Sequence, residues 1–277
     1  MSRFGHRVGV TAAFCSVLAA ASLGGARAAD WPLRGSVDPG FARWDGWQFG
    51  VQAGLANMRT DFANSAGSQV AFILRNTIQE TEFAPSSWTT VAPDTTNGQV
   101  YGAFLAYNMQ WDRLVVGFDM NYKYAASVDT TAADTISRQF VTSDQFLNQL
   151  TIDARSTMKL VDYATLRGRA GYAFGNFLPY AVIGAAAGRF NYATTVTVDM
   201  QGAPTGGAPG VPFHIIQTAS VGKNNAIVGG VAAGLGVDWA ITPGMFMRVE
   251  WEYVAFSPVN GSRNNINTAN LGVGMRF

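Results

Sequence analysis

Charge is scarce in this sequence. Asp, Glu, Lys and Arg make up only 13% of the 277 residues, whereas about a quarter is usual for soluble domains. After residue 28, no segment is apolar over the roughly eighteen residues that a membrane-spanning helix needs. A chain that is apolar overall but lacks helical spans is typical of a membrane β-barrel, because each barrel strand is apolar on one side only.

Cysteine and histidine are nearly absent as well. The one cysteine, Cys15, lies in an apolar N-terminal run that we expect to be removed. The mature chain would then have no disulfide framework, no thiol catalysis and no cysteine-ligated zinc or iron–sulfur site. One histidine, His214, lies beyond that run, and a lone histidine makes a poor metal site. We therefore expect no cofactor and no metal.

The N-terminus resembles a secretory signal peptide. Arg3 and Arg7 precede an uncharged run, and Ala26-Arg27-Ala28 offers a cleavage site. Removing the three arginines leaves 16 basic residues (19 − 3) against 18 acidic ones, so the basic surplus of a nucleic-acid-binding surface is missing. We predict a signal peptide, a periplasmic N-terminal segment and an outer-membrane β-barrel, at residues 1–28, 29–45 and 46–277.

Eight segments alternate apolar with polar or small residues, which is the pattern of a half-buried strand. In one of them, Leu114, Val116 and Phe118 share a face opposite Gly117 and Asp119. Aromatic residues lie near the segment ends, as in the girdles of a membrane barrel: Trp47, Trp111, Trp239, Tyr107, Phe174, Tyr180 and Tyr192. The predicted strands are 47–55, 101–111, 114–124, 160–174, 178–192, 226–240, 245–253 and 269–277.

The connections between these segments alternate strictly between short and long. Short turns are expected around Asp112, Asn176 and Pro243. The long connections are 56–99, 125–159, 193–225 and 254–265. Alternation places every short turn at the end that holds both termini, so we predict an all-β, eight-stranded antiparallel transmembrane β-barrel with short periplasmic turns and long extracellular loops. Gln69 to Asn76 could add a strand within the first long connection.

Four motifs resemble those of the small outer-membrane β-barrel surface antigens, the "porin family" proteins, of alphaproteobacteria. They occur in that family's order: an opening W-x-G-x-Y/F-x-G strand, an R-x-R-x-G-Y hairpin followed by Pro-Tyr, an R-x-E-Y-x-Y strand and a closing aromatic strand. The matching segments are 44–50, 166–174 with Pro179-Tyr180, 248–253 and 272–277. Asp238-Trp239 departs from the family's Glu-Tyr, and the first long connection is unusually long. The resemblance implies a bacterial outer-membrane location.

The alternation places ten charged residues on the inner face of the barrel: Asp119, Lys123, Arg167, Arg169, Arg189, Asp238, Arg248, Glu250, Glu252 and Arg276. Charges facing lipid would cost about 2–4 kcal/mol each at the bilayer midplane, and an eight-stranded barrel barely holds its own side chains. Because both signs are nearly balanced, we favour a charged network that fills the lumen, in an envelope protein with a structural, surface-exposed role. The alternative is a small-solute porin whose selectivity these charges set.

The chain ends on a strict alternation that stops at an aromatic residue. The resemblance implies that Leu271, Val273, Met275 and Phe277 form the signal that directs insertion into the outer membrane. The expected partners are therefore outer-membrane lipids, lipopolysaccharide and the barrel-assembly machinery, and the long loops could bind a surface ligand.

We see no enzyme in the sequence. His214 borders a Gly/Pro-rich loop and has no serine partner, so a solvated loop histidine is the simpler interpretation. A lipid-active enzyme is the alternative from this class. The aspartates of 125–159 lack calcium-loop spacing, and the apolar residues of 72–88 are expected to pack against one another.

Overall fold

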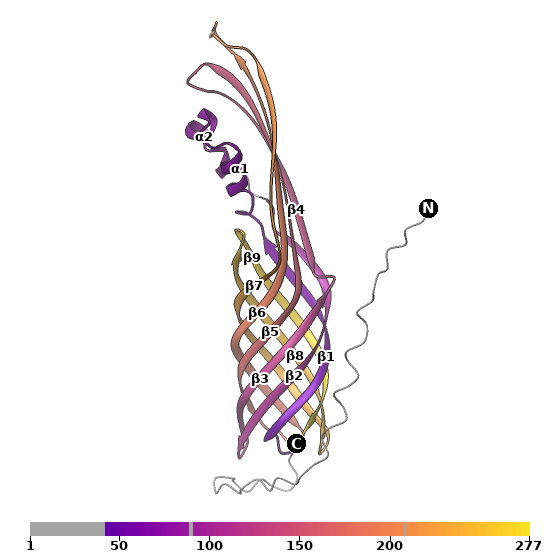
Figure 1. The fold of residues 1–277 in the computed structure, drawn as a ribbon. Coiled ribbons are helices and arrows are strands. Elements are labelled where there is room, and N and C mark those ends of the chain that lie inside the picture. The colour runs from indigo at the N-terminus through magenta and orange to yellow at the C-terminus, as the bar shows by residue number, and fades with distance from the viewer. Residues whose placement is uncertain (1–41, 89–90, 208) are drawn as a thin grey trace, which may run out of the picture. The chain divides into compact units, whose positions relative to one another are not determined.

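Nine strands and three short helices form the described part of the chain, residues 42–88, 91–207 and 209–277 of a computed structural model (Figure 1). The strands are β1 (Gly46–Asp61), β2 (Asp94–Trp111), β3 (Leu114–Ala126), β4 (Asp129–Val141), β5 (Phe146–Tyr172), β6 (Phe177–Pro204), β7 (Phe213–Thr242), β8 (Met245–Val259) and β9 (Ser262–Arg276). The helices are α1 (Gly67–Ile73), α2 (Ile78–Phe83) and the 3₁₀ helix η1 (Pro85–Ser87). The predicted signal peptide, 1–28, and most of segment 29–45 lie outside the described residues.

Eight of these strands close into an antiparallel ring. The hydrogen-bonded order is β3-β2-β1-β9-β8-β7-β6-β5, and pairing between β3 and β5 completes the circle. β4 pairs with β5 alone, in the same direction as β3, and so continues β3 after a break in which Ser127 has a φ of +56°. The chain therefore makes eight passes, and the expected fold class is confirmed.

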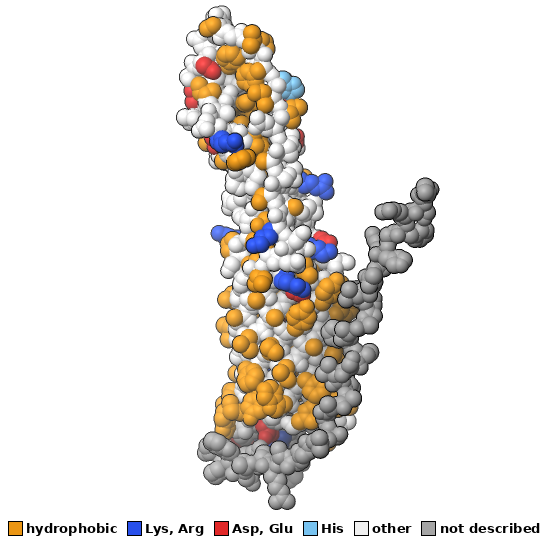
Figure 2. Space-filling view, viewed as in Figure 1, with side chains coloured by type: hydrophobic (Ala, Val, Ile, Leu, Met, Phe, Trp, Pro, Cys, Tyr) orange, Lys and Arg blue, Asp and Glu red, His pale blue; other side chains and the backbone are white. Residues whose placement is uncertain are grey.

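Strand β8 shows how the alternation sorts side chains. Val249 and Trp251 point outward and are exposed, whereas Arg248 and Glu250 point inward and are buried. The outward positions carry an apolar band around the barrel, which on β1 runs from Trp47 to Leu55 before Arg59 follows. In Figure 2, hydrophobic side chains gather over the lower barrel, with most of the visible charged side chains above them and a few at the lower end.

The three predicted short turns are present at one end of the barrel. Asp112 and Gly175 adopt positive φ values of 52° and 55° there, and Pro243 joins β7 to β8. At the other end, Asn260 and Gly261 have φ values of 48° and 73°. Positive φ at both central residues is the geometry of a two-residue hairpin turn.

Three connections expected to be long loops, 125–159, 193–225 and 254–265, are mostly strands, and the last is reduced to the two-residue turn between β8 and β9. β4, β5, β6 and β7 continue beyond the barrel as a four-stranded sheet that we call the extension (Figure 1). Its inner face is apolar and buried, with Leu150 and Ile152 on β5 and Val196 and Val198 on β6. Its outer face carries threonine and serine side chains that form hydrogen bonds across the strands, as Thr195 does with Ser220 and Thr197 with Thr218.

The first long connection covers the inner face of the extension. Residues 69–76 do not form the additional strand considered from the sequence, because most of them lie in helix α1. Val70 and Leu74 are four residues apart, so a helical turn buries both on the core of the extension. Ile73 and Trp88 pack against that core, whereas Phe72 is 60% exposed. None of the helices in the described residues is long and apolar enough to cross a membrane.

Candidate functional site: the barrel lumen

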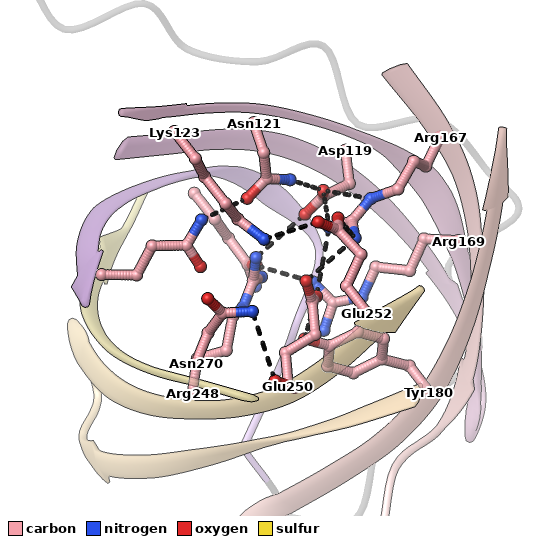
Figure 3. Close-up of polar contacts among 12 residues, drawn as sticks. Asp119, Asn121, Lys123, Arg167, Arg169, Tyr180, Arg248, Glu250, Glu252 and Asn270 are labelled. Carbon is pink, nitrogen blue, oxygen red and sulfur yellow. Dashed lines mark hydrogen bonds and ion pairs between the residues drawn. The ribbon is translucent and has the colours of Figure 1, made fainter. Parts of the chain in front are cut away.

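A network of charged side chains crosses the barrel lumen (Figure 3). The structure brings together eight of the ten residues that the sequence placed inside: Asp119, Lys123, Arg167, Arg169, Asp238, Arg248, Glu250 and Glu252. Their side chains are inaccessible to solvent, and they come from β3, β5, β7 and β8. These side chains share the lumen because every second residue of a barrel strand points inward.

Arg167 is the hub of this network. Its Nη2 lies 2.5 Å from Asp119 Oδ1, and its Nη1 lies 2.9 Å from Glu250 Oε1 and 2.5 Å from Glu252 Oε2. One guanidinium thus donates to three carboxylates on two different strands. Such charge-assisted hydrogen bonds are roughly twice as strong as neutral ones.

Arg248 extends the network toward the short-turn end of the barrel. It donates to Asp119 and to Asp238, each at 2.9 Å. Asp238 also accepts from Arg169 at 2.5 Å. The Arg248 guanidinium lies 3.9 Å from the centre of the Phe104 ring, a cation–π distance. Shared carboxylates therefore join the three arginines Arg167, Arg248 and Arg169 into one chain.

Lys123 and two tyrosines also bind the carboxylates of the network. Lys123 Nζ lies 2.7 Å from Glu252 Oε1, and the Tyr163 hydroxyl donates to the same oxygen at 3.1 Å. The Tyr180 hydroxyl donates to Glu250 at 2.8 Å. Sequence reasoning missed both tyrosines. It placed Tyr180 in the aromatic girdle, but the ring points into the lumen, where a Cβ on Gly236 would lie 2.4 Å from it.

The network is electrically balanced. Its four cationic groups, on Lys123, Arg167, Arg169 and Arg248, equal its four carboxylates, on Asp119, Asp238, Glu250 and Glu252. Each of the eight groups lies within ion-pair distance of at least one opposite charge. Buried charges are tolerated when they are paired in this way, so these side chains can fill the lumen without a bound counterion.

Arg189 does not belong to this network, and the prediction for it was wrong. Leu178, Tyr180 and Val182 are the buried positions of β6, so Arg189 falls on the outward phase. Its side chain is 46% exposed and pairs with Asp162, which also accepts a hydrogen bond from the Tyr122 hydroxyl at 2.9 Å. The ion pair lies on the outside of the barrel above the apolar band.

Arg276 is the second correction. It faces inward, but at the short-turn end of the barrel, away from the eight network residues. Its guanidinium donates to the carbonyl oxygens of Pro243 at 2.6 Å and Arg43 at 2.8 Å, and it lies 4.8 Å from the centre of the Trp44 ring. Arg276 therefore binds the turn between β7 and β8 to the segment that precedes β1.

Apolar layers lie on both sides of the charged network. The inward residues of β8 show the sequence of layers: Phe246, then Arg248, Glu250 and Glu252, then Val254 and Phe256. On the short-turn side, Phe246 packs with Trp44, Phe104, Val115, Ala173, Leu178 and Ala240. On the extension side, Phe256 packs against Phe190 and Tyr163, with ring centroids 5.0 and 6.3 Å away. The charged network therefore lies between two clusters of buried apolar side chains.

The family model "Outer membrane protein beta-barrel domain" matches residues 15–277, which is most of the chain. The chain belongs to this outer-membrane β-barrel family. It is therefore a bacterial outer-membrane protein, and the apolar band is the surface that meets lipid. The buried charged network is the interior of a membrane-spanning barrel.

Solved structures similar to this barrel protein include three with low sequence identity. Ail of Yersinia pestis is 12% identical, with 84% of this chain and 100% of that one covered at a TM-score of 0.33. Neisserial surface protein A is 13% identical, with 83% and 97% covered at 0.32. OprG of Pseudomonas aeruginosa is 12% identical, with 87% and 99% covered at 0.34. Among curated proteins, no significant match exists.

His214 is on the outer face of the extension in this barrel protein. Its Nε2 lies 2.9 Å from Asp199 Oδ1, across the β6–β7 pair, and its side chain is 53% exposed. It therefore lies in strand β7, at the border of the Gly/Pro-rich loop, and not in a loop as expected. In the described residues, no group of three or more His, Cys, Asp or Glu is arranged to hold a metal ion.

Proposed function

We propose that this protein is a structural, surface-exposed component of the outer membrane whose lumen does not conduct solutes. The observation that carries the proposal is the layered lumen, in which a neutral ion-pair network lies between two apolar clusters. A pore needs a continuous wet path, and hydrophobic constrictions close such paths by excluding water. The small-solute porin remains the alternative, and ion conductance across planar bilayers separates the two.

The extension supports the surface role. It places a rigid sheet and the helices α1 and α2 beyond the apolar band, at the end opposite the short turns. Function in such scaffolds usually lies in segments held outside the rigid barrel. We propose that this end faces the cell exterior and that the short turns face the periplasm.

A protease recognition sequence inserted at each end tests this orientation. Insertion after Gly207, where glycine has open space around it, is expected to allow cleavage on intact cells. The matched insertion after Asn176, in the short turn between β5 and β6, is expected to resist protease until the outer membrane is permeabilised. Cleavage at Asn176 with protection at Gly207 on intact cells would refute the proposed orientation.

The partners follow from the same placement. The apolar band would contact lipid, and lipopolysaccharide would surround the outer end of the barrel. The resemblance of the C-terminal strand to those of alphaproteobacterial surface antigens supports recognition by the barrel-assembly machinery. We propose no catalytic role, and unchanged acyl chains on lipopolysaccharide incubated with the purified barrel would agree with this.

A further inference from the structure

The extension has two lateral edges that differ in chemistry. β4 forms one edge and carries the charged residues Asp129, Asp134 and Arg138. Near its start, the Thr131 amide donates to Asp94 Oδ2 at 3.0 Å, so a side chain occupies part of this edge. Charged residues and occupied backbone groups are the usual means by which proteins prevent strands from pairing with other chains. The β4 edge is protected.

The other edge, the outer edge of β7 from Phe213 to Gly222, is not protected. It contains no Asp, Glu, Lys, Arg or proline over ten residues. β6 pairs with this segment rung by rung, from Phe213 opposite Gly202 to Gly222 opposite Ala193. β8 pairs with β7 only from Gly230 to Thr242, so in the described part of the chain no strand pairs with the outer edge of Phe213–Gly222. A row of backbone donors and acceptors is left open.

The side chains beside this edge define what could pair with it. Ile216 on one face and Ile215 on the other are 60% and 41% exposed. Nearer the barrel on the same strand, the side chains carry hydroxyl groups. The hydroxyl of Thr218 lies 3.0 Å from that of Thr197, and the hydroxyl of Ser220 lies 3.0 Å from that of Thr195. A strand beside β7 would find apolar and hydroxyl neighbours on its cross-strand positions. The edge therefore suits an uncharged segment rich in β-branched residues.

We propose that Phe213–Gly222 binds an extended, uncharged segment of a partner protein, which joins the extension as a fifth antiparallel strand. Backbone hydrogen bonds would supply affinity, and the two isoleucines would select apolar side chains. β6 already pairs with the opposite edge of this same segment in antiparallel register. That the partner lies outside the cell rests on the orientation proposed above, whereas strand addition itself does not.

A second copy of this chain fits the edge less well. Two barrels in one membrane that are related by an axis along the membrane normal have β7 strands running in the same direction. They could pair only in parallel, which is slightly less stable per residue than antiparallel pairing. A segment from another protein has no such restriction. It can run away from the membrane, antiparallel to β7.

A peptide with the sequence of residues 193–202, in which asparagine replaces Asp199 so that the peptide side chains are uncharged, is the probe. The parent sequence already pairs with Phe213–Gly222 in antiparallel register. Binding of the fluorescent peptide to the purified full-length barrel is measured by anisotropy, and protection of β7 amides by hydrogen exchange. We expect saturable binding that a scrambled peptide lacks, with added protection confined to Phe213–Gly222. Purified protein is used, so a failure here is distinguishable from a wrong orientation in the cell.

Two lysine variants locate the binding site. Thr218→Lys adds a charge on the open β7 edge, and Thr135→Lys makes the same change on the protected β4 edge. Both threonines are exposed, so both variants should fold with unchanged heat-modifiable mobility. Thr218→Lys is expected to weaken peptide binding about tenfold or more, and Thr135→Lys to leave it unchanged. Equal effects of the two variants, no saturable binding, or a dimer that Thr218→Lys dissolves would each overturn the proposal.

Discussion

Replacing Arg167 by leucine is expected to destabilise the barrel by about 3–5 kcal/mol, the range for removing one partner from a buried charge network. Arg167 donates to Asp119, Glu250 and Glu252 at 2.5 to 2.9 Å. Its loss would leave the network with three cationic groups against four carboxylates in the lumen. The free energy of unfolding can be measured by urea titration in detergent or vesicles, with the heat-modifiable band on gels as the readout.

Lys159→Leu is the matched control, because it removes a cation from the same strand outside the lumen. Lys159 lies 3.6 Å from Asp129, and both side chains are about half exposed. Exposed ion pairs contribute little to stability, so this variant should unfold close to the wild-type urea concentration. A second variant, Arg167→Leu with Glu250→Leu, restores the balance of charge and should recover part of the loss. Equal midpoints for Arg167→Leu and Lys159→Leu would contradict a network that stabilises the fold.

Deleting Phe277 is expected to remove most of the assembled protein from the outer membrane. The Phe277 amide donates to the Trp47 carbonyl at 3.0 Å, and its ring stacks on Phe49 with centroids 5.5 Å apart. The ring is nevertheless 72% exposed, so its packing within the chain is modest. We therefore expect the deletion to impair insertion by the cell far more than the stability of the folded barrel. Heat-modifiable protein in membrane fractions measures the first, and refolding into lipid vesicles measures the second.

Phe174→Ala provides the comparison for the Phe277 deletion. Phe174 is also an exposed aromatic at the short-turn end, with 57% of its surface accessible, but it is far from the C-terminus in sequence. Its loss should leave assembly in cells nearly normal. Two results would contradict a recognition role for the terminal strand. One is normal assembly in cells after deletion of Phe277, and the other is a defect in vesicle refolding as large as the defect in cells.

Much of the barrel could be predicted from the alternation of side chains. Positions that face lipid need apolar side chains, whereas positions that face the narrow lumen take small or polar ones. β8 carries this signal clearly, with Trp251 outside and Glu250 inside. β6 does not, because alanine and glycine occupy both of its faces. Arg189 was assigned to the wrong face for that reason, and Tyr180 was taken for a girdle residue.

The extension was missed for a different physical reason. Its strands alternate valine with threonine, as at Val196 and Thr197, but no lipid demands aromatic residues on the outer face. The pattern is therefore weaker than in the barrel. The side chain of Tyr163 points into the lumen because the β5–β6 register shifts between Leu160 and Asp162. A bulge of this kind exchanges the two faces of a strand, and nothing in the local composition marks it.

Single-channel recording across planar lipid bilayers tests the central claim most directly, since that claim is a lumen closed by a neutral network and two apolar layers. The purified full-length barrel is reconstituted in one bilayer and a Trp44→Ala, Phe246→Ala variant in another. These two rings, 6.1 Å apart, form part of the short-turn apolar layer. We predict no steady open events for the wild type and more frequent open events for the variant. Steady open events from the wild-type barrel, unchanged in the variant, would contradict the closed lumen and favour the small-solute porin.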